Sequence, residues 1–132
     1  VLAEIADVID ELGLRRLVIQ VGLDSEVGLG GIRLTLPQRQ KLALGRALVR
    51  RPDWLLLDDA LALFDRAEQE RLRDRLLEAS RGRTVLWAHM RPEWAEQFDR
   101  VLVFEGGRVT AAGTPGEVSV RKGDLAAVAA GA

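Results

Sequence analysis

The feature that most constrains the fold is an apolar run that ends in two adjacent acids, WLLLDD at residues 54–59. An apolar run bounded by polar residues is typical of a strand covered on both faces, as in a parallel sheet. Ligands of open α/β sheets gather at the carboxyl ends of such strands. Asp58 and Asp59 could therefore hold a cation or activate a water molecule, and the plainer alternative is that they only begin a solvated loop.

Helical patterns occur on both sides of this strand. Apolar side chains recur at helical spacing over residues 2–12. A second helix is predicted over residues 36–50, because Thr35 and Gln38 form a Ser/Thr-x-x-Gln capping box at its start. A third helix is predicted over residues 66–79. Helices that alternate with buried strands favour an α/β fold.

The C-terminal half adds further strands. Residues 84–89 form a second apolar run, and it ends at His89, the only histidine of the chain. A short helix is predicted over residues 92–97, and residues 100–113 predict a hairpin about a Glu-Gly-Gly turn. The weakly patterned residues 114–132 allow one closing helix.

Composition bounds the class of protein. The chain has 132 residues, 48% of them apolar and 30% charged, which suits one soluble globular domain. A net charge of -1 gives no sign of nucleic-acid binding. The lack of cysteine excludes disulfides and fits a reducing cytoplasm. No apolar run is long enough to cross a bilayer, and Val1 begins in the middle of a helical pattern, which indicates a fragment or a processed product.

Five short motifs then follow one another: SEVGLGG at residues 25–31, LTLPQ at 34–38, LLLDD at 55–59, ALFD at 62–65, and His89. Their order and spacing resemble the C-terminal half of an exporter-type ATP-binding cassette (ABC) nucleotide-binding domain. The resemblance covers roughly residues 20–118. It implies the C-terminal part of a P-loop NTPase fold, a mostly parallel sheet flanked by helices with a C-terminal β-hairpin.

The resemblance also implies three portions. Residues 1–50 would be the helical portion that carries the signature motif. Residues 51–118 would carry the Walker B strand, the D-loop and the switch histidine, and residues 119–132 would be a C-terminal tail. As part of a transporter, such a domain couples binding and hydrolysis of Mg-ATP to transport across a membrane.

In that family, the acids after the Walker B strand and the switch histidine serve catalysis. The resemblance implies that Asp58 holds Mg²⁺ through water and that Asp59 orients or deprotonates the attacking water. The family usually has Glu at the position of Asp59, and a displacement of about 1 Å can cost roughly a hundredfold in rate. His89 would donate to the γ-phosphate. Its strand is one residue shorter than usual, and such a change reverses the facing of a side chain. The plainer alternative for His89 is a strand-end histidine bonded to the backbone.

The signature motif implies ATP-binding roles for Thr35, Leu36, Pro37 and Gln38, and the D-loop motif implies one for Asp65. Leu36 and Pro37 replace a glycine pair. Leucine brings a Cβ, and proline removes an N–H donor. We therefore expect an intact helix with a weakened grip on phosphate. Thr35 and Gln38 would form a plain helix cap in any case, and Asp65 would cap the helix that follows it.

The same resemblance supplies expectations about partners. It implies a second nucleotide-binding domain in a head-to-tail dimer, membrane-spanning domains, a place at the cytoplasmic face of the plasma or inner membrane, and no nucleic acid. The motif G-x-x-x-x-G-K-[ST] is absent, so the chain alone is predicted to be inactive. Two alternatives remain: a degenerate cassette that binds nucleotide and dimerises without hydrolysis, and a soluble signature-bearing ATPase of the chromosome-maintenance type.

Other side chains are expected to have ordinary structural roles. The three arginines on one face of the second predicted helix would form a solvated face. The three tryptophans would pack in the core or at its edge. These residues are Arg39, Arg46, Arg50, Trp54, Trp87 and Trp94.

Overall fold

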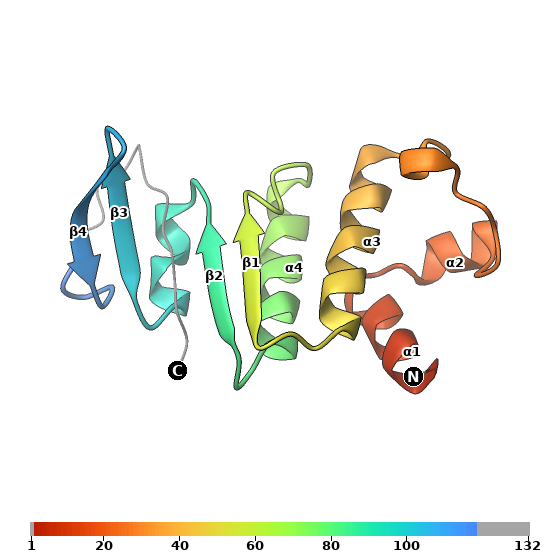
Figure 1. Cartoon of the computed structure of the whole chain (residues 1–132), viewed down its shortest axis with the longest axis horizontal. Coiled ribbons are helices and arrows are strands. Elements are labelled where there is room, and N and C mark those ends of the chain that lie inside the picture. Colours follow the sequence, from red (N-terminus) through yellow and green to blue (C-terminus); the bar gives the residue numbers. More distant parts are fainter. Residues whose placement is uncertain (1, 119–132) are drawn as a thin grey trace. The chain divides into compact units, whose positions relative to one another are not determined.

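The computed structural model describes residues 2–118, which form two compact units (Figure 1). Unit 1 contains residues up to Pro52 together with Leu61–Ala79. Unit 2 contains Asp53–Ala60 together with the residues from Ser80 onward. Within the described residues, every α-helix belongs to unit 1 and every strand to unit 2. The tail predicted over residues 119–132, and most of its closing helix, lies outside the described residues.

Unit 1 contains all the α-helices of the described residues. They are α1 (Leu2–Glu11), α2 (Arg15–Val21), α3 (Leu36–Val49) and α4 (Arg66–Ala79), with one turn of 3₁₀ helix at Leu29–Gly31. The sequence predicted α1, α3 and α4 with ends within one residue, whereas it predicted no helix at the position of α2. The chain reverses between α1 and α2 at Gly13, whose φ of +64° favours glycine.

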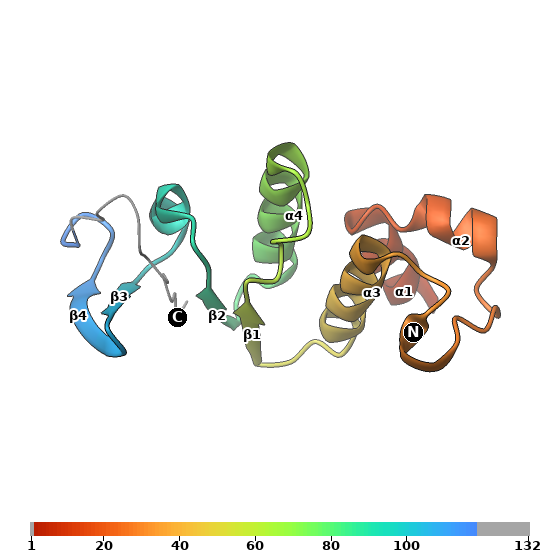
Figure 2. The same cartoon turned by 90° about the horizontal axis from the view of Figure 1, so that it is seen from above.

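The core of unit 1 forms where α1 packs on α3, an arrangement that both views show (Figure 1, Figure 2). Leu12, which follows α1, and Leu44 and Leu48 of α3 are buried. Gly45 of α3 faces α1: a Cβ at this position would lie 3.4 Å from Val8 Cγ1 and from Leu12 Cδ1. The small residue thus lets the two helices approach closely.

Unit 2 contains two separate pairs of strands. β1 (Trp54–Asp58) and β2 (Thr84–Ala88) are parallel, in a register that pairs Trp54 with Thr84 and Asp58 with Ala88. β3 (Val101–Glu105) and β4 (Arg108–Gly113) form the predicted hairpin. Gly106 and Gly107 at its turn both have positive φ, as a two-residue type I′ turn requires. A 3₁₀ helix, η2 (Pro92–Gln97), precedes β3.

These elements confirm that the fold contains both helices and strands and belongs to the α/β class. The described strands form one parallel pair and one antiparallel hairpin, rather than a single, mostly parallel sheet. The connections explain the pairing. The segment that contains α4 joins β1 to β2 and permits a parallel crossover, while a two-residue turn between β3 and β4 permits only antiparallel pairing. Within residues 2–118, no helix combines the length and apolar character needed to cross a membrane.

Candidate functional site

The two acids of the opening motif lie at the carboxyl end of β1. Asp58 is the last residue of the strand and Asp59 follows it, and both are exposed. The Asp59 N–H donates to the Ala88 carbonyl at 2.8 Å, which fixes this turn against the end of β2. Asp59 has a φ of +43°, a left-handed conformation that aspartate tolerates better than most residues.

Neither carboxylate is engaged by another of the described residues, so both can bind a cation or water. Within residues 2–118, no group of three or more acids or histidines could hold a metal ion alone. A divalent cation here would take further ligands from water and from a bound anion. Mg²⁺ at phosphates has this preference, because it keeps several waters and uses one or two carboxylates. The donor set at Asp58 therefore fits Mg²⁺ held beside a phosphate ligand.

His89 follows β2 directly and is buried, with 4% of its surface exposed. Its ring lies in an aromatic cluster, with centroids 5.1 Å from Trp94, 5.8 Å from Phe98 and 6.1 Å from Trp87. The backbone N–H of Arg91 donates to Nδ1 at 3.0 Å. Because Nδ1 accepts this bond, the neutral ring carries its proton on Nε2, which is then the donor.

The direction in which the His89 side chain points follows from the alternation of side chains along β2. Trp87 is fully buried, and alternate residues of a strand share a face, so His89 points to the side of Trp87. The backbone bond expected for a plain strand-end histidine is present. The role of His89 at a phosphate stays a prediction, and it requires the ligand to reach Nε2 within the aromatic cluster.

At the start of α3, the capping box is confirmed. The Thr35 N–H donates to Gln38 Oε1 at 2.9 Å, and the Gln38 N–H donates to Thr35 Oγ1 at 3.4 Å. Leu36 and Pro37 are exposed in the first turn. Proline has no N–H and the cap uses that of Gln38, so Leu36 supplies the one free N–H of this turn.

Asp65 caps α4 as expected. Its Oδ1 accepts from the Glu68 N–H at 2.9 Å. The turn before it is braced by the buried side chain of Gln69, whose Nε2 donates to the Phe64 carbonyl at 2.9 Å. Asp65 thus has a structural role in the chain, and its contact with ATP stays a prediction.

The predicted site residues fall into two groups. In unit 2, the β1–β2 register brings Asp58, Asp59 and His89 to the same end of the parallel pair. In unit 1, residues 35–38 begin α3 and Asp65 begins α4. The structure therefore assembles the two acids with the histidine in unit 2, and places the start of α3 and the turn before α4 in unit 1.

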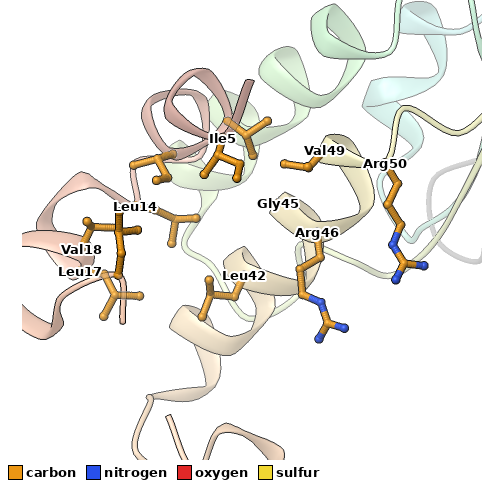
Figure 3. Close-up of a pocket in the computed structure, with 12 residues that line it drawn as sticks. Ile5, Leu14, Leu17, Val18, Leu42, Gly45, Arg46, Val49 and Arg50 are labelled. Atoms are coloured by element: carbon orange, nitrogen blue, oxygen red, sulfur yellow. The ribbon is translucent and has the colours of Figure 1, made fainter. Parts of the chain in front are cut away.

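Unit 1 also contains a groove that the motifs did not indicate (Figure 3). It has a volume of about 370 Å³, and its walls are mostly apolar side chains of α1, α2 and α3. Arg46 and Arg50 line it too, and their guanidinium groups extend from α3 away from the apolar side chains (Figure 3). Both are exposed, as expected of a solvated face, but Arg39 is half-buried and donates to the Gly30 carbonyl at 3.4 Å.

Sequence reasoning did not single out Lys41. Its Nζ lies 2.5 Å from Glu68 Oε1 and 5.6 Å from the centroid of the Phe64 ring. Arg71 donates to the same carboxylate through Nε at 2.8 Å and Nη2 at 2.6 Å. The bonds from Arg71 and the ammonium of Lys41 lower the pKa of Glu68 from its ordinary value of 4.5 to about 2, against the effect of burial. No local pattern could have found a contact between residues 27 positions apart.

This fold and these motifs define the class of the protein as the C-terminal part of an exporter-like ABC domain. The chain belongs to the ABC transporter family. It is 35% identical over 107 residues to an ATP-dependent lipid A-core flippase of Alkalilimnicola ehrlichii, covering 81% of the chain and 18% of the flippase. It is 40% identical over 103 residues to the ABC multidrug transporter MDR5 of Trichophyton rubrum, covering 77% of the chain and 8% of the transporter.

A solved structure agrees with these relatives. The chain is similar to a bacterial Atm1-family ABC exporter with ATP bound, with a TM-score of 0.75 and 25% identity, over 87% of this chain and 20% of the exporter. No family model matches the chain. The chain spans less than a fifth of the length of the flippase and of MDR5. The comparisons favour the transporter over the chromosome-maintenance alternative.

Proposed function

We propose that this chain is the signature-to-switch segment of an ATP-binding domain that couples binding and hydrolysis of Mg-ATP to export across a membrane. The observation that carries the proposal is the end of the β1–β2 pair. There the register places Asp58 beside Ala88, and the Asp59 N–H bonds to the Ala88 carbonyl. Two exposed acids and the switch histidine thus follow the ends of neighbouring parallel strands, where α/β proteins bind their ligands.

In this proposal, each acid has a different task. Asp58 holds Mg²⁺ through water, and the ion would supply charge neutralisation at the phosphates. Asp59 accepts a hydrogen bond from the attacking water and orients it for in-line attack. His89 donates from Nε2 to the γ-phosphate. The exposure of the two carboxylates supports the roles of Asp58 and Asp59. The proton on Nε2 supports a donor role for His89, and that role requires the phosphate to reach a buried ring.

The remaining ATP contacts belong to the signature and the D-loop. Thr35, Leu36, Pro37 and Gln38 at the exposed start of α3 would meet the γ-phosphate bound by a second domain in a head-to-tail dimer, and Asp65 would lie at the same interface. A helix start offers its dipole to an anion. Because only the N–H of Leu36 is free in the first turn, this contact is weaker than a glycine pair would make it.

The groove of unit 1 supports a protein partner. Apolar walls are costly to leave in water, and Arg46 and Arg50 have no ion pair within the described part of the chain. A membrane-spanning domain with an apolar, acidic cytoplasmic segment would satisfy both features. We therefore place the domain at the cytoplasmic face of the plasma or inner membrane, with no role for nucleic acid.

The decisive experiment uses the complete protein that contains this segment, with Asp59 replaced. Asp59→Asn keeps the size and the left-handed backbone but removes the base, so turnover of Mg-ATP should be lost. Asp59→Glu moves the carboxylate about 1 Å toward the water, so kcat should rise by roughly ten- to a hundredfold with little change in KM for ATP. Thermal unfolding of both variants controls for strain at the positive φ.

The Asp59→Glu result can also contradict the role proposed for Asp59. If Asp59→Glu leaves kcat unchanged or lowers it at wild-type stability, Asp59 is not the catalytic carboxylate. The single free N–H at the start of α3 would then favour the second candidate, a cassette that binds nucleotide and dimerises without hydrolysis.

A further inference from the structure

We propose that Lys41, acting through Glu68, is a positioning residue that fixes the start of the signature helix α3 relative to the ALFD turn at residues 62–65. The inference rests on the proposed function, because these two segments are the ones expected to meet ATP across a dimer. It adds residues that lie outside the signature and D-loop motifs.

The contacts of Lys41 join two elements of unit 1 that are distant in sequence. Lys41 lies on α3, three residues after Gln38, and its ammonium reaches Glu68 in the first turn of α4. The same ammonium lies over the ring of Phe64, in cation–π range. One side chain therefore contacts both the turn and the helix that follows it.

Glu68 anchors this contact from the side of α4. Oε1 is shared between Lys41 and Arg71 Nη2, and Oε2 accepts from Arg71 Nε. The backbone N–H of the same residue is held by Asp65. Glu68 is thus fixed at its backbone and at both carboxylate oxygens, which is the geometry of a rigid acceptor.

This ion pair differs from ordinary surface pairs. The side chains of Lys41 and Glu68 are only 17% and 23% exposed, whereas those of Arg15 and Asp10 are 71% and 49% exposed. Partial burial reduces solvent screening, and shared hydrogen bonds make a network more rigid than an isolated pair. The Lys41–Glu68 ion pair can therefore hold α3 and α4 at a fixed distance from each other.

The packing around the start of α3 is open. The backbones of α3 and α4 come close at few positions. A cavity of about 300 Å³ lies at the start of α3, and Pro37, Gln38, Lys41 and Phe64 are among the residues that line it. Because the first turn of α3 is not packed tightly on Phe64, the ion pair limits how far the two segments can move apart.

The first test measures position in the chain itself, without nucleotide. The chain has no cysteine, so Leu36→Cys and Leu63→Cys, both at exposed positions, allow two spin labels to report the distance between α3 and the turn. Lys41→Met keeps the apolar stem and removes the charge. We expect it to broaden the distance distribution, and we expect Lys41→Arg to restore the narrow one.

Two controls separate positioning from general loosening. Arg15→Met removes the exposed ion pair with Asp10 and should leave the distribution narrow. Labels at Leu36→Cys and Ile19→Cys, which do not report on α4, should be insensitive to Lys41→Met. An unchanged Leu36–Leu63 distribution in Lys41→Met overturns the inference.

The second test uses the complete protein with hydrolysis blocked by Asp59→Asn. Lys41→Met should weaken Mg-ATP-induced dimerisation by about tenfold, and Lys41→Arg should restore it, while nucleotide-free behaviour stays the same. If the label distance broadens but dimerisation is unchanged, the inference is overturned. If ATP induces no dimer in the Asp59→Asn parent itself, the proposed function fails, and the label experiment still decides the role of Lys41 in the fold.

Discussion

At the scale of single residues, His89 is held by its neighbours rather than by its strand. Its ring contacts Trp87, Trp94 and Phe98, and its Nδ1 accepts from the Arg91 backbone. A polar ring can be buried in such a cluster when its nitrogen acceptor is satisfied. The position therefore combines packing with a fixed tautomer, and the two can be separated by substitution.

His89→Ala should destabilise the chain by about 2 kcal/mol, because removal of the ring leaves a cavity among aromatic neighbours. His89→Phe keeps most of the packing and loses the bond from the Arg91 N–H, and this lost bond should cost about 1 kcal/mol. Urea unfolding followed by tryptophan fluorescence measures both values.

The same pair tests chemistry in the complete protein. If Nε2 donates to phosphate, both variants should lose turnover, because neither has the donor. Recovery of turnover in His89→Phe would show that the residue acts through packing alone.

The sequence could predict which residues lie at this strand end, but not the direction in which their side chains point. The apolar run before Asp58 and Asp59 indicated a buried strand, and β1 ends where the run ends. The environment of His89 depends on the length of β2 and on Trp94 and Phe98, which come from η2 and the segment after it. Such contacts between segments leave no periodic signal in the sequence.

At the scale of elements, substitutions at the start of α3 should change dimerisation and helix stability by different amounts. Replacing Leu36 and Pro37 with Gly-Gly restores an N–H at position 37 and removes a side chain from the path of a phosphate. In the complete protein with hydrolysis blocked, we expect tighter Mg-ATP-induced dimerisation, measured by sedimentation. The helix itself should lose only about 1 kcal/mol, since Thr35 and Gln38 keep the cap.

Thr35→Ala is the matched control for the Gly-Gly replacement. It removes the cap and should cost about 1 kcal/mol of stability without restoring any donor. Equal or weaker dimerisation in the Gly-Gly protein would mean that residues 34–38 do not meet phosphate as the signature motif does.

The junction of α3 and α4 predicts a pH dependence. The pKa of Glu68 is about 2 in the folded chain, below its ordinary 4.5, so the folded state favours the charged form. The stability that Glu68 contributes is therefore fully present above about pH 4.5 and is lost as the pH falls toward 2. Glu68→Gln should be less stable than the wild type by about 1 to 2 kcal/mol at pH 7, with the difference vanishing near pH 2. Denaturant unfolding across this range measures it.

The helices show which features the sequence alone can predict. Caps are local, so the starts of α3 and α4 at Thr35 and Asp65 were predicted from patterns within four residues. The contact of Lys41 with Glu68 depends on the packing of two helices and could not be predicted. Likewise, Arg39 was expected in solvent, but its side chain folds back over Gly31, where a Cβ would lie 3.1 Å from Arg39 Cδ.

At the scale of the whole molecule, the chain lacks the phosphate-binding loop that the proposed reaction needs. We expect the purified 132-residue chain to show no magnesium-dependent ATP turnover and at most weak ATP binding. Phosphate release and calorimetric titration measure the two. Turnover that Asp58→Asn abolishes would contradict the prediction and show that these residues form a complete site.

The segregation of elements gives the two units different optical signatures. All three tryptophans, Trp54, Trp87 and Trp94, belong to unit 2, while every described α-helix belongs to unit 1. Indole emission therefore reports the melting of unit 2, and ellipticity at 222 nm reports mainly the melting of the α-helices of unit 1. Coincident transitions would establish one cooperative unit, and separated transitions would reveal two independent melting events within 132 residues.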